Sequence, residues 1–361
     1  MTKAAVFNAV HEPLTIEEID VADPIGNEVL VRTAASGVCH SDLHFIEGLY
    51  PMPNRAILGH EAAGVVEAVG PNVTEVVPGD HVIACLSVFC GHCDYCMTGR
   101  MHLCNNRPAR GADQPPRLSQ DGKMLTQFAS VGSYAEQMLL HENGIVKIDK
   151  DFPLAQAALI GCGVTTGVGA ALRTAKVTPG STVAVFGAGG IGLSAIQGAR
   201  IAGARQIIAV DMVEHKLQTA REFGATHAVD ASLGDPVQQI QDLTDGQGVD
   251  FSFEAIGLKV AAEQAWAALR SGGTATVIGM IPIGQKVEIP GNEFLREKKI
   301  QGSSMGSNSF KVDMPQYIEF YRQGRLLLDE MINRTRPLEE INEAFADMKS
   351  GEVARSVIMF D

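Results

Sequence analysis

Four cysteines are crowded together at residues 90, 93, 96 and 104, with the spacing Cx2Cx2Cx7C. Four thiolates this close can surround one Zn2+ tetrahedrally and leave no open position, as structural zinc sites do. An iron–sulfur cluster is the main alternative, but in the ferredoxin pattern the fourth cysteine follows after three residues and precedes a proline. Four free structural thiols are a weaker alternative. The sequence therefore predicts a structural zinc site with the ligands Cys90, Cys93, Cys96 and Cys104.

The run GAGGIG follows the apolar stretch TVAVF and opens a stretch with helical spacing. In a dinucleotide-binding fingerprint the first glycine makes the turn, the second lets the backbone approach a pyrophosphate, and the third packs helix on sheet. A lone GxGxxG is weak evidence, but Asp211 ends the next apolar stretch, 19 residues after Gly192. A carboxylate there accepts hydrogen bonds from ribose hydroxyls and repels a 2'-phosphate, which favours NAD over NADP. The predicted NAD contacts here are Gly187, Gly189, Gly190, Ile191, Gly192 and Asp211.

A second set of possible metal ligands is dispersed along the chain: Cys39 in SGVCHSD, His60 and Glu61 in GHEAAG, and Cys162 in IGCGVTTG. Each of these residues alone fits an ordinary buried side chain. Together with the run GHEx2Gx5Gx2V that starts at Gly59, the cysteine cluster and the glycine fingerprint, they match a known pattern over essentially the whole chain. The sequence resembles the zinc-dependent medium-chain alcohol dehydrogenases.

The resemblance implies a catalytic zinc held by Cys39, His60 and Cys162, with water or substrate in the fourth position. Glu61 would approach the metal when water leaves, or would stay nearby without coordinating, and both interpretations are open. In such enzymes a zinc-bound alcohol loses its proton readily, and the alkoxide passes a hydride to NAD. The implied reaction is oxidation of a primary or secondary alcohol, medium-chain or aryl, to an aldehyde or ketone. The implied cofactors are two Zn2+ per chain and NAD.

The resemblance also assigns roles to residues around this centre. Asp42 is expected to orient the His60 ring, with a simple turn residue as the alternative. Ser41 and His44 are expected to carry the substrate proton to solvent, with a plain surface histidine as the alternative for His44. Further implied cofactor contacts are His40, Thr166, Lys216 and Arg355, the last of which could instead be an exposed charge at a strand start. The implied substrate pocket consists of Leu86, Phe128, Ala129, Met280 and Met305, although core packing explains each of them equally well.

Two other functions compete with this one. An S-(hydroxymethyl)glutathione (formaldehyde) dehydrogenase would use an arginine after the cysteine cluster, where this chain has Pro108 between Arg107 and Arg110, and would tend to carry tyrosine in place of His44. A non-catalytic nucleotide-sensing relative would keep the fold and lose the open metal site first. Because the ligand set, the relay and the fingerprint are all intact, we expect an NAD-dependent alcohol dehydrogenase.

The elements that must position these residues follow two rhythms. Residues 3 to about 148 contain short β-rich runs separated by proline and glycine, which predicts a β-rich, barrel-like domain. After residue 163, apolar strands alternate with helical stretches, which predicts a parallel sheet with helices on both faces. The expected fold class is α/β. By resemblance, residues 1–163 and 305–361 form a GroES-like catalytic domain, and residues 164–304 form a Rossmann NAD-binding domain.

Length and composition set limits on the remaining possibilities. With 361 residues the chain is long enough for two domains, and its net charge of -13 disfavours nucleic acid and anionic membranes as partners. No signal-peptide core and no 18-residue apolar run is found, so a cytoplasmic protein acting on a small alcohol or aldehyde is expected. Residues 105–132 are expected to form a long surface excursion. This feature resembles the dimeric family members and predicts a homodimer paired through Rossmann sheet edges.

Overall fold

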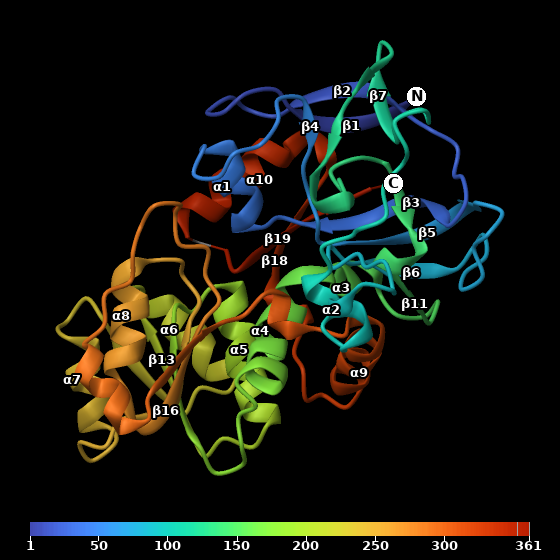
Figure 1. The fold of residues 1–361 in the computed structure, drawn as a ribbon. Helices are drawn as coiled ribbons and strands as arrows, with labels where there is room; N and C mark the ends of the chain where they lie inside the picture. Colours follow the sequence, from blue (N-terminus) through green and yellow to red (C-terminus); the bar gives the residue numbers. More distant parts are fainter. Residues whose placement is uncertain (352, 361) are drawn as a thin grey trace. The chain divides into compact units, whose positions relative to one another are not determined.

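The computed structural model describes residues 1–351 and 353–360, and the chain forms two compact units. Unit 1 consists of Met1–Cys162, Ser309–Glu319 and Leu328–Asp361, and unit 2 consists of Gly163–Asn308 and Phe320–Leu327. The chain, coloured along its sequence in Figure 1, therefore leaves unit 1 after residue 162 and ends in unit 1. The division into these two units does not test the predicted domain boundaries at residues 163 and 305, which stay a prediction.

Unit 1 is built on two β-sheets, as the short β-rich runs predict. Six strands form the first sheet in the order β8-β7-β2-β1-β4-β9. They are β1 (Thr2–Phe7), β2 (Thr15–Val21), β4 (Ala56–Ile57), β7 (Leu118–Gln120), β8 (Lys123–Met124) and β9 (Thr126–Gln127). The second sheet has the order β11-β6-β5-β3-β19-β18, and β10 also pairs with β3. Its strands are β3 (Glu28–Gly37), β5 (Ala62–Val69), β6 (His81–Ala84), β10 (Gln137–His141), β11 (Ile145–Ile148), β18 (Ile332–Arg336) and β19 (Arg355–Met359).

Strand β3 is the centre of the second sheet, and it leads directly to the candidate site. It pairs antiparallel with β5, β10 and β19, and Val31 lies opposite both Met138 and Val66. Within β3 the β-branched residues Val29 and Val31 are fully buried, whereas Arg32 is exposed. This alternation matches the period of two expected for a strand with one covered face.

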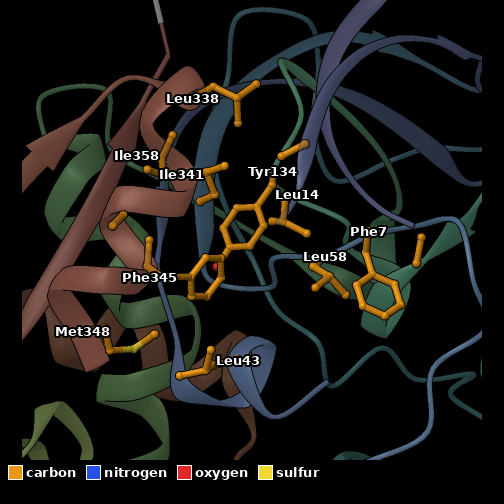
Figure 2. Close-up of a cluster of buried hydrophobic side chains, with 14 residues drawn as sticks. Phe7, Leu14, Leu43, Leu58, Tyr134, Leu338, Ile341, Phe345, Met348 and Ile358 are labelled. Carbon is orange, nitrogen blue, oxygen red and sulfur yellow. The ribbon is translucent and has the colours of Figure 1, made fainter. Parts of the chain in front are cut away.

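The helices of unit 1 pack apolar faces onto these sheets. Those wholly inside the unit are α1 (His40–Ile46), α2 (Asp94–Met97), α3 (Leu154–Leu159) and α10 (Ile341–Ser350), and α9 (Phe310–Arg322) begins there. In α10 the buried residues Ile341, Ala344, Phe345 and Met348 recur at helical spacing. They join a buried apolar cluster with Tyr134, Leu43 and Ile358, which Figure 2 shows. The helix ends at Ser350 and is followed by Gly351, whose positive φ of 73° suits glycine.

The segment 105–132 is more ordered than a plain surface excursion. It contributes strands β7, β8 and β9 to the first sheet, and β7 pairs with β2. Leu118 and Leu125 are 1% and 3% exposed and belong to a buried cluster with Ile19. Apolar burial at these two leucines, in a stretch otherwise rich in turn residues, explains the strands that the sequence analysis did not predict.

Unit 2 contains a six-stranded sheet in which every strand pair is parallel, in the order β14-β13-β12-β15-β16-β17. Its strands are β12 (Thr182–Phe186), β13 (Gln206–Asp211), β14 (His227–Asp230), β15 (Val249–Glu254), β16 (Leu269–Val277) and β17 (Lys299–Gly302). Its helices, several of which are labelled in Figure 1, are α4 (Thr165–Gly169), α5 (Gly190–Ile201), α6 (Glu214–Glu222), α7 (Pro236–Asp242) and α8 (Lys259–Ala267). The predicted doubly wound parallel sheet is confirmed. Strand order reverses between β12 and β15, where such sheets bind their ligands.

One helical stretch is more apolar than the sequence analysis noted. Leu154–Thr174 is 21 residues long and apolar enough to cross a membrane by length and composition. However, 83% of its most apolar window is buried inside the protein. Burial in the protein core therefore accounts for its composition.

Candidate active site

The four clustered cysteines converge around the short helix α2. Their sulfur atoms all lie within 4.8 Å of one another, and Cys93 Sγ is 3.5 Å from Cys96 Sγ and 3.8 Å from Cys104 Sγ. Zinc–sulfur bonds of about 2.3 Å at tetrahedral angles place sulfurs about 3.8 Å apart. A backbone hydrogen bond from Cys96 lowers the pKa of the Cys93 thiol to about 6, which favours the thiolate that a metal needs. The set therefore fits a closed, structural zinc site.

A second set of ligands converges from three distant parts of unit 1. Cys39 lies between β3 and α1, His60 lies between β4 and β5, and Cys162 lies in a π-helical turn, Ile160–Val164, that follows α3. Their ligand atoms lie within 4.8 Å of one another. All three residues are buried, with exposed fractions of 2%, 1% and 4%. Two sulfurs and one imidazole suit Zn2+, and three protein ligands leave a fourth position for another molecule, as in catalytic zinc sites.

The glycine fingerprint of unit 2 has the geometry of a phosphate-binding turn. Gly187 follows β12 with a positive φ of 96°, and a Cβ at Gly192 would lie 1.8 Å from the Gly187 carbonyl oxygen. A Cβ at Gly189, by contrast, would meet no atom within 4 Å, so the space beside this backbone suits an approaching ligand. Asp211 ends β13, and its Oδ2 accepts a hydrogen bond of 2.8 Å from the Ala188 N–H. These residues fit a nicotinamide dinucleotide.

Comparison with known proteins agrees with this geometry. Residues 26–150 match the family model described as alcohol dehydrogenase GroES-like domain, and residues 190–323 match the one described as zinc-binding dehydrogenase. A similar crystal structure is that of an alcohol dehydrogenase zinc-binding domain protein from Burkholderia ambifaria, with 40% identity over 100% of this chain and 99% of that chain and a TM-score of 0.94. The chain belongs to the zinc-binding medium-chain alcohol dehydrogenase family.

Two further similar structures extend the comparison across the family. The benzyl alcohol dehydrogenase from Acinetobacter calcoaceticus is 35% identical, with coverage of 100% of this chain and 99% of that chain and a TM-score of 0.94. The alcohol dehydrogenase from the archaeon Aeropyrum pernix is 30% identical, with coverage of 99% and 100% and a TM-score of 0.84. Unit 1 is thus the GroES-like, barrel-shaped part of this zinc-binding dehydrogenase, and unit 2 is its Rossmann-like part.

Charge is distributed unequally within the dehydrogenase's buried ligand set. A hydrogen bond from Cys162 lowers the pKa of the Cys39 thiol well below its ordinary value, and positive charge on His60 and Arg355 adds to this effect. The same hydrogen bond, together with burial, raises the pKa of Cys162. Burial alone would lower the pKa of His60, but Asp42 and Cys39 outweigh it and raise that pKa well above its usual range. The pocket is therefore arranged for a cation.

Asp42 lies directly behind the ligand histidine. Its Oδ1 is 3.2 Å from His60 Nδ1 and accepts a hydrogen bond of 2.9 Å from the Gly59 N–H. Asp42 is 0% exposed although it lies in the first turn of α1. With Nδ1 donating to Asp42, the His60 Nε2 atom carries the lone pair that a metal needs.

Glu61 and Arg355 form a buried ion pair in the dehydrogenase. Arg355 Nη1 lies 3.1 Å from Glu61 Oε2, and the side chains are 5% and 0% exposed. An exposed charge at the start of β19, the alternative considered for Arg355, is therefore not what the structure shows. Glu61 is also in close contact with the backbone, because a Cβ at Gly37 would lie 2.8 Å from its Oε2. Glycine at this position makes room for the carboxylate.

The predicted proton relay residues lie on α1, beside the ligand set. Ser41 Oγ is 3.6 Å from Cys39 Sγ. His44 is half-buried and stacks on Tyr50 with ring centroids 6.1 Å apart, and burial lowers its pKa. Its Nδ1 atom is buried and has no hydrogen-bond partner among the described residues. His40, the first residue of the helix, is exposed.

Aromatic rings form a wall against the ligand histidine. Phe128 contacts the His60 ring edge-on, with ring centroids 5.5 Å apart, and the centroids of the Phe45 and Phe128 rings are 4.8 Å apart. Phe45 in turn lies 5.9 Å from Tyr50. Of the predicted pocket residues in unit 1, Phe128 thus lies at the metal ligands, with Ala129 next to it in a backbone conformation of φ 51°. Leu86 packs beside a buried apolar cluster of the second sheet, and its role in a substrate pocket stays a prediction.

The other predicted residues lie in unit 2. Thr166 lies in α4, and its Oγ1 is 3.2 Å from Met305 Sδ. Met280 follows β16, and its backbone lies close to Gly257. Lys216 lies in α6, after the end of β13 that carries Asp211. The cofactor and substrate roles of these four residues stay predictions.

Two buried polar residues, one beside the metal ligands of unit 1 and one beside the glycine fingerprint of unit 2, were not predicted from the sequence. Tyr134 is 0% exposed and donates a hydrogen bond of 3.0 Å to Asp42 Oδ2. Glu254, also 0% exposed, ends β15, and its Oε1 accepts hydrogen bonds from the Ile256 and Gly257 N–H groups in a turn that contacts Gly187. Neither residue lies in a spacing pattern that marks chemistry. For Glu254, an acidic residue at the end of a buried parallel strand was the available signal.

Proposed function

We propose that this zinc-binding dehydrogenase oxidises aryl and medium-chain primary alcohols to aldehydes with NAD. The observation that carries the proposal is the convergence of Cys39, His60 and Cys162 beneath an aromatic side chain. A zinc ion held by these residues would supply Lewis acidity that eases loss of the alcohol's hydroxyl proton, and bound NAD would accept the hydride. The alcohol is oxidised to the aldehyde, NAD is reduced to NADH, and one proton is released.

The chain's own residues have distinct tasks in this proposal. Asp42 holds His60 in the tautomer whose Nε2 faces the ligand set. Ser41, next to Cys39, accepts the proton of the substrate hydroxyl as its own hydroxyl proton is passed on, and His44 is the final acceptor in the protein. Because burial lowers the pKa of His44, this imidazole is neutral at pH 7 and ready to accept that proton.

The aromatic wall supports an aryl substrate. Phe128 lies against His60 and Phe45 lies behind it, so a flat ring delivered to the ligand set would meet an aromatic edge. Offset and edge-to-face ring contacts of this kind contribute about 0.5–1.5 kcal/mol each. The similarity to a benzyl alcohol dehydrogenase points to the same substrate class.

The preference for NAD is inferred from Asp211. Its carboxylate already accepts hydrogen bonds from the Ala188 and Met212 N–H groups, at 2.8 Å each, so it stays in place at the end of β13. A negative charge fixed there favours ribose hydroxyls and disfavours a 2'-phosphate. Lys216 lies close by in the sequence and limits this discrimination rather than reversing it.

A glutathione-linked formaldehyde substrate is less well supported. Arg110 is 7% exposed at its side chain and is held by Glu28, so it is not available to bind a thiol carrier. Of the two arginines that flank Pro108, this leaves Arg107, which is exposed. His44 occupies the place where that branch tends to have tyrosine.

The test is a substrate panel followed by NADH absorbance. Benzyl alcohol, hexanol and S-(hydroxymethyl)glutathione are compared with NAD and with NADP. For the wild type we expect the highest kcat/KM with benzyl alcohol and NAD. In Phe128→Ala the ratio of kcat/KM for benzyl alcohol to kcat/KM for hexanol should fall roughly tenfold. Turnover of S-(hydroxymethyl)glutathione above both alcohols, or of NADP above NAD, would contradict the corresponding part of the proposal. Metal analysis separates the enzyme from the nucleotide sensor, because the enzyme should carry two zinc ions per chain and the sensor one or none.

We also propose that the protein is a cytoplasmic homodimer. β17 lies at the end of the strand order and pairs on one side with β16. Leu295 and Ile283, in the segment before it, are 90% and 67% exposed. An open strand edge with apolar side chains nearby is a surface that proteins normally cover. Light scattering should give twice the mass of the chain for the wild type and the single mass for Leu295→Glu, whereas equal masses for both would count against this interface.

A further inference from the structure

Tyr134 is a polar residue in an apolar surrounding. Its ring belongs to the buried cluster of unit 1, beside Phe345, as Figure 2 shows. The two rings meet edge-on with centroids 6.0 Å apart. The side chain is 0% exposed, so its hydroxyl has exchanged water for protein partners. Burying a hydroxyl without a hydrogen bond is destabilising, so the partner of this one is informative.

That partner is the carboxylate behind the ligand histidine. The Tyr134 hydroxyl donates to Asp42 Oδ2 at 3.0 Å, and it also lies 3.4 Å from the Gly37 carbonyl oxygen. The other carboxylate oxygen, Oδ1, faces the Gly59 N–H at 2.9 Å and His60 Nδ1 at 3.2 Å. Burial and the charge of Asp42 raise the pKa of Tyr134 well above its ordinary value, so the hydroxyl stays a donor. Both oxygens of Asp42 are therefore engaged.

We propose that Tyr134 is a positioning residue of the candidate catalytic metal centre and acts on His60 through Asp42. The carboxylate can rotate about its Cβ–Cγ bond, and a donor on Oδ2 fixes the angle at which Oδ1 meets the imidazole. Deleting the hydroxyl leaves Oδ2 charged, buried and without this donor, so the carboxylate turns toward its remaining partners. The His60 ring then loses its fixed orientation toward Cys39 and Cys162.

This inference rests on the proposed function in one respect, namely that the buried ligand set binds a metal. The competing explanation is that Tyr134 serves packing alone and that its hydroxyl is merely satisfied by Asp42. The two explanations differ in where a Tyr134→Phe substitution is felt. A packing role affects the stability of the cluster, whereas a positioning role affects metal retention and the ligand field of the metal.

The experiment uses the full chain loaded with Co2+ in place of zinc. Tyr134→Phe keeps the ring contacts and removes one oxygen. For this variant we expect the catalytic-site metal to be lost to a chelator roughly tenfold faster than in the wild type. Tenfold is the lower end of the effect of removing a group that hydrogen-bonds a metal ligand. The visible absorption bands of the cobalt at this site should also shift. The metal held by Cys90 and its neighbours, in the same unit, should be lost at the wild-type rate, which shows that the variant is folded.

Two matched comparisons make the result specific. Tyr317→Phe removes a hydroxyl from another buried tyrosine of unit 1, 1% exposed, and should leave both metals and both spectra unchanged. In an Asp42→Asn background, Tyr134→Phe should change metal loss less than twofold, because the charge through which it acts is absent.

Equal metal loss in Tyr134→Phe and Tyr317→Phe would overturn the proposal, as would an undiminished effect in the Asp42→Asn background. Both results would leave the proposed function standing. A wild-type protein that binds no metal at Cys39, His60 and Cys162 would overturn the proposed function together with this inference. The two failures are therefore distinguishable.

Discussion

Replacing Glu28 with glutamine should destabilise unit 1 by roughly 3–5 kcal/mol, the usual cost of removing one member of a buried ion pair. The Glu28 side chain is 5% exposed and contacts two guanidinium groups, Arg110 Nη2 at 2.5 Å and Arg117 Nε at 2.7 Å. Two opposite charges about 4 Å apart attract by about 4 kcal/mol at an effective dielectric constant near 20. Glutamine keeps the shape but leaves both arginines without their counter-ion, at the point where the 105–132 segment is tied to β3.

The pH dependence of this effect has a definite sign. Burial alone would raise the pKa of Glu28, but hydrogen bonds from Arg110 and Arg117 outweigh it and lower that pKa below the ordinary value of 4.5. A carboxyl group whose pKa is lowered by folding stabilises the protein above the unfolded pKa, and its contribution is lost as pH falls through the folded pKa. The stability gap between wild type and Glu28→Gln should therefore be full at pH 7 and narrow progressively below pH 4.5.

Equilibrium urea unfolding followed by far-ultraviolet circular dichroism measures this gap. The control is Glu67→Gln, because Glu67 pairs with Arg32 at 3.9 Å and the two side chains are 34% and 45% exposed. Such a surface pair contributes less than about 1 kcal/mol. Equal effects of the two substitutions at pH 7, or a Glu28→Gln gap that does not shrink in acid, would refute the electrostatic reasoning.

Two further predictions concern the metal sites and the relay. Cys162→Ser should remove one metal and abolish turnover while the metal of the cysteine cluster stays. Cys96→Ser should instead lower the melting temperature more than it lowers the turnover of the enzyme that remains folded. Metal analysis and thermal unfolding distinguish these outcomes, and loss of both metals in either variant would count against two separate sites. His44→Gln should lower the rate of alcohol oxidation roughly tenfold, less than for a base in direct contact with substrate, because His44 acts through Ser41. Since burial lowers the pKa of His44, the wild-type rate should fall as the imidazole gains its proton below about pH 6.5, and this acid limb should be absent in the variant, as a pH profile of kcat would show.

The two ligand sets could be predicted for different reasons. The close spacing of four cysteines around Cys93 points to zinc by itself. Cys39, His60 and Cys162 are far apart in the sequence, and only the resemblance to a known family brought them together. The parallel sheet of unit 2, like the cysteine cluster, was predictable from a local pattern. A central strand such as β12 is buried on both faces, so it appears as the uninterrupted apolar run TVAVF.

The polar partners behind the ligands could not be predicted in this way. Tyr134 reaches Asp42 across 92 positions of sequence, and Arg110 reaches Glu28 across 82. Such pairs depend on which strands lie side by side, and no local period encodes that. The 105–132 segment illustrates the same limit, since two buried leucines among turn residues are too few to mark a strand.

The precision of the candidate catalytic site therefore comes from the fold of unit 1 more than from its motifs. Asp42 comes from α1, Tyr134 precedes β10, and Arg355 begins β19. All three are buried, and each has a hydrogen-bond partner at the site: Asp42 contacts His60, Tyr134 contacts Asp42, and Arg355 contacts Glu61. A buried polar group is stable only when it is paired, so each of these residues constrains the others. Conservative changes in this network should consequently appear first as altered metal retention, and only secondarily as loss of fold.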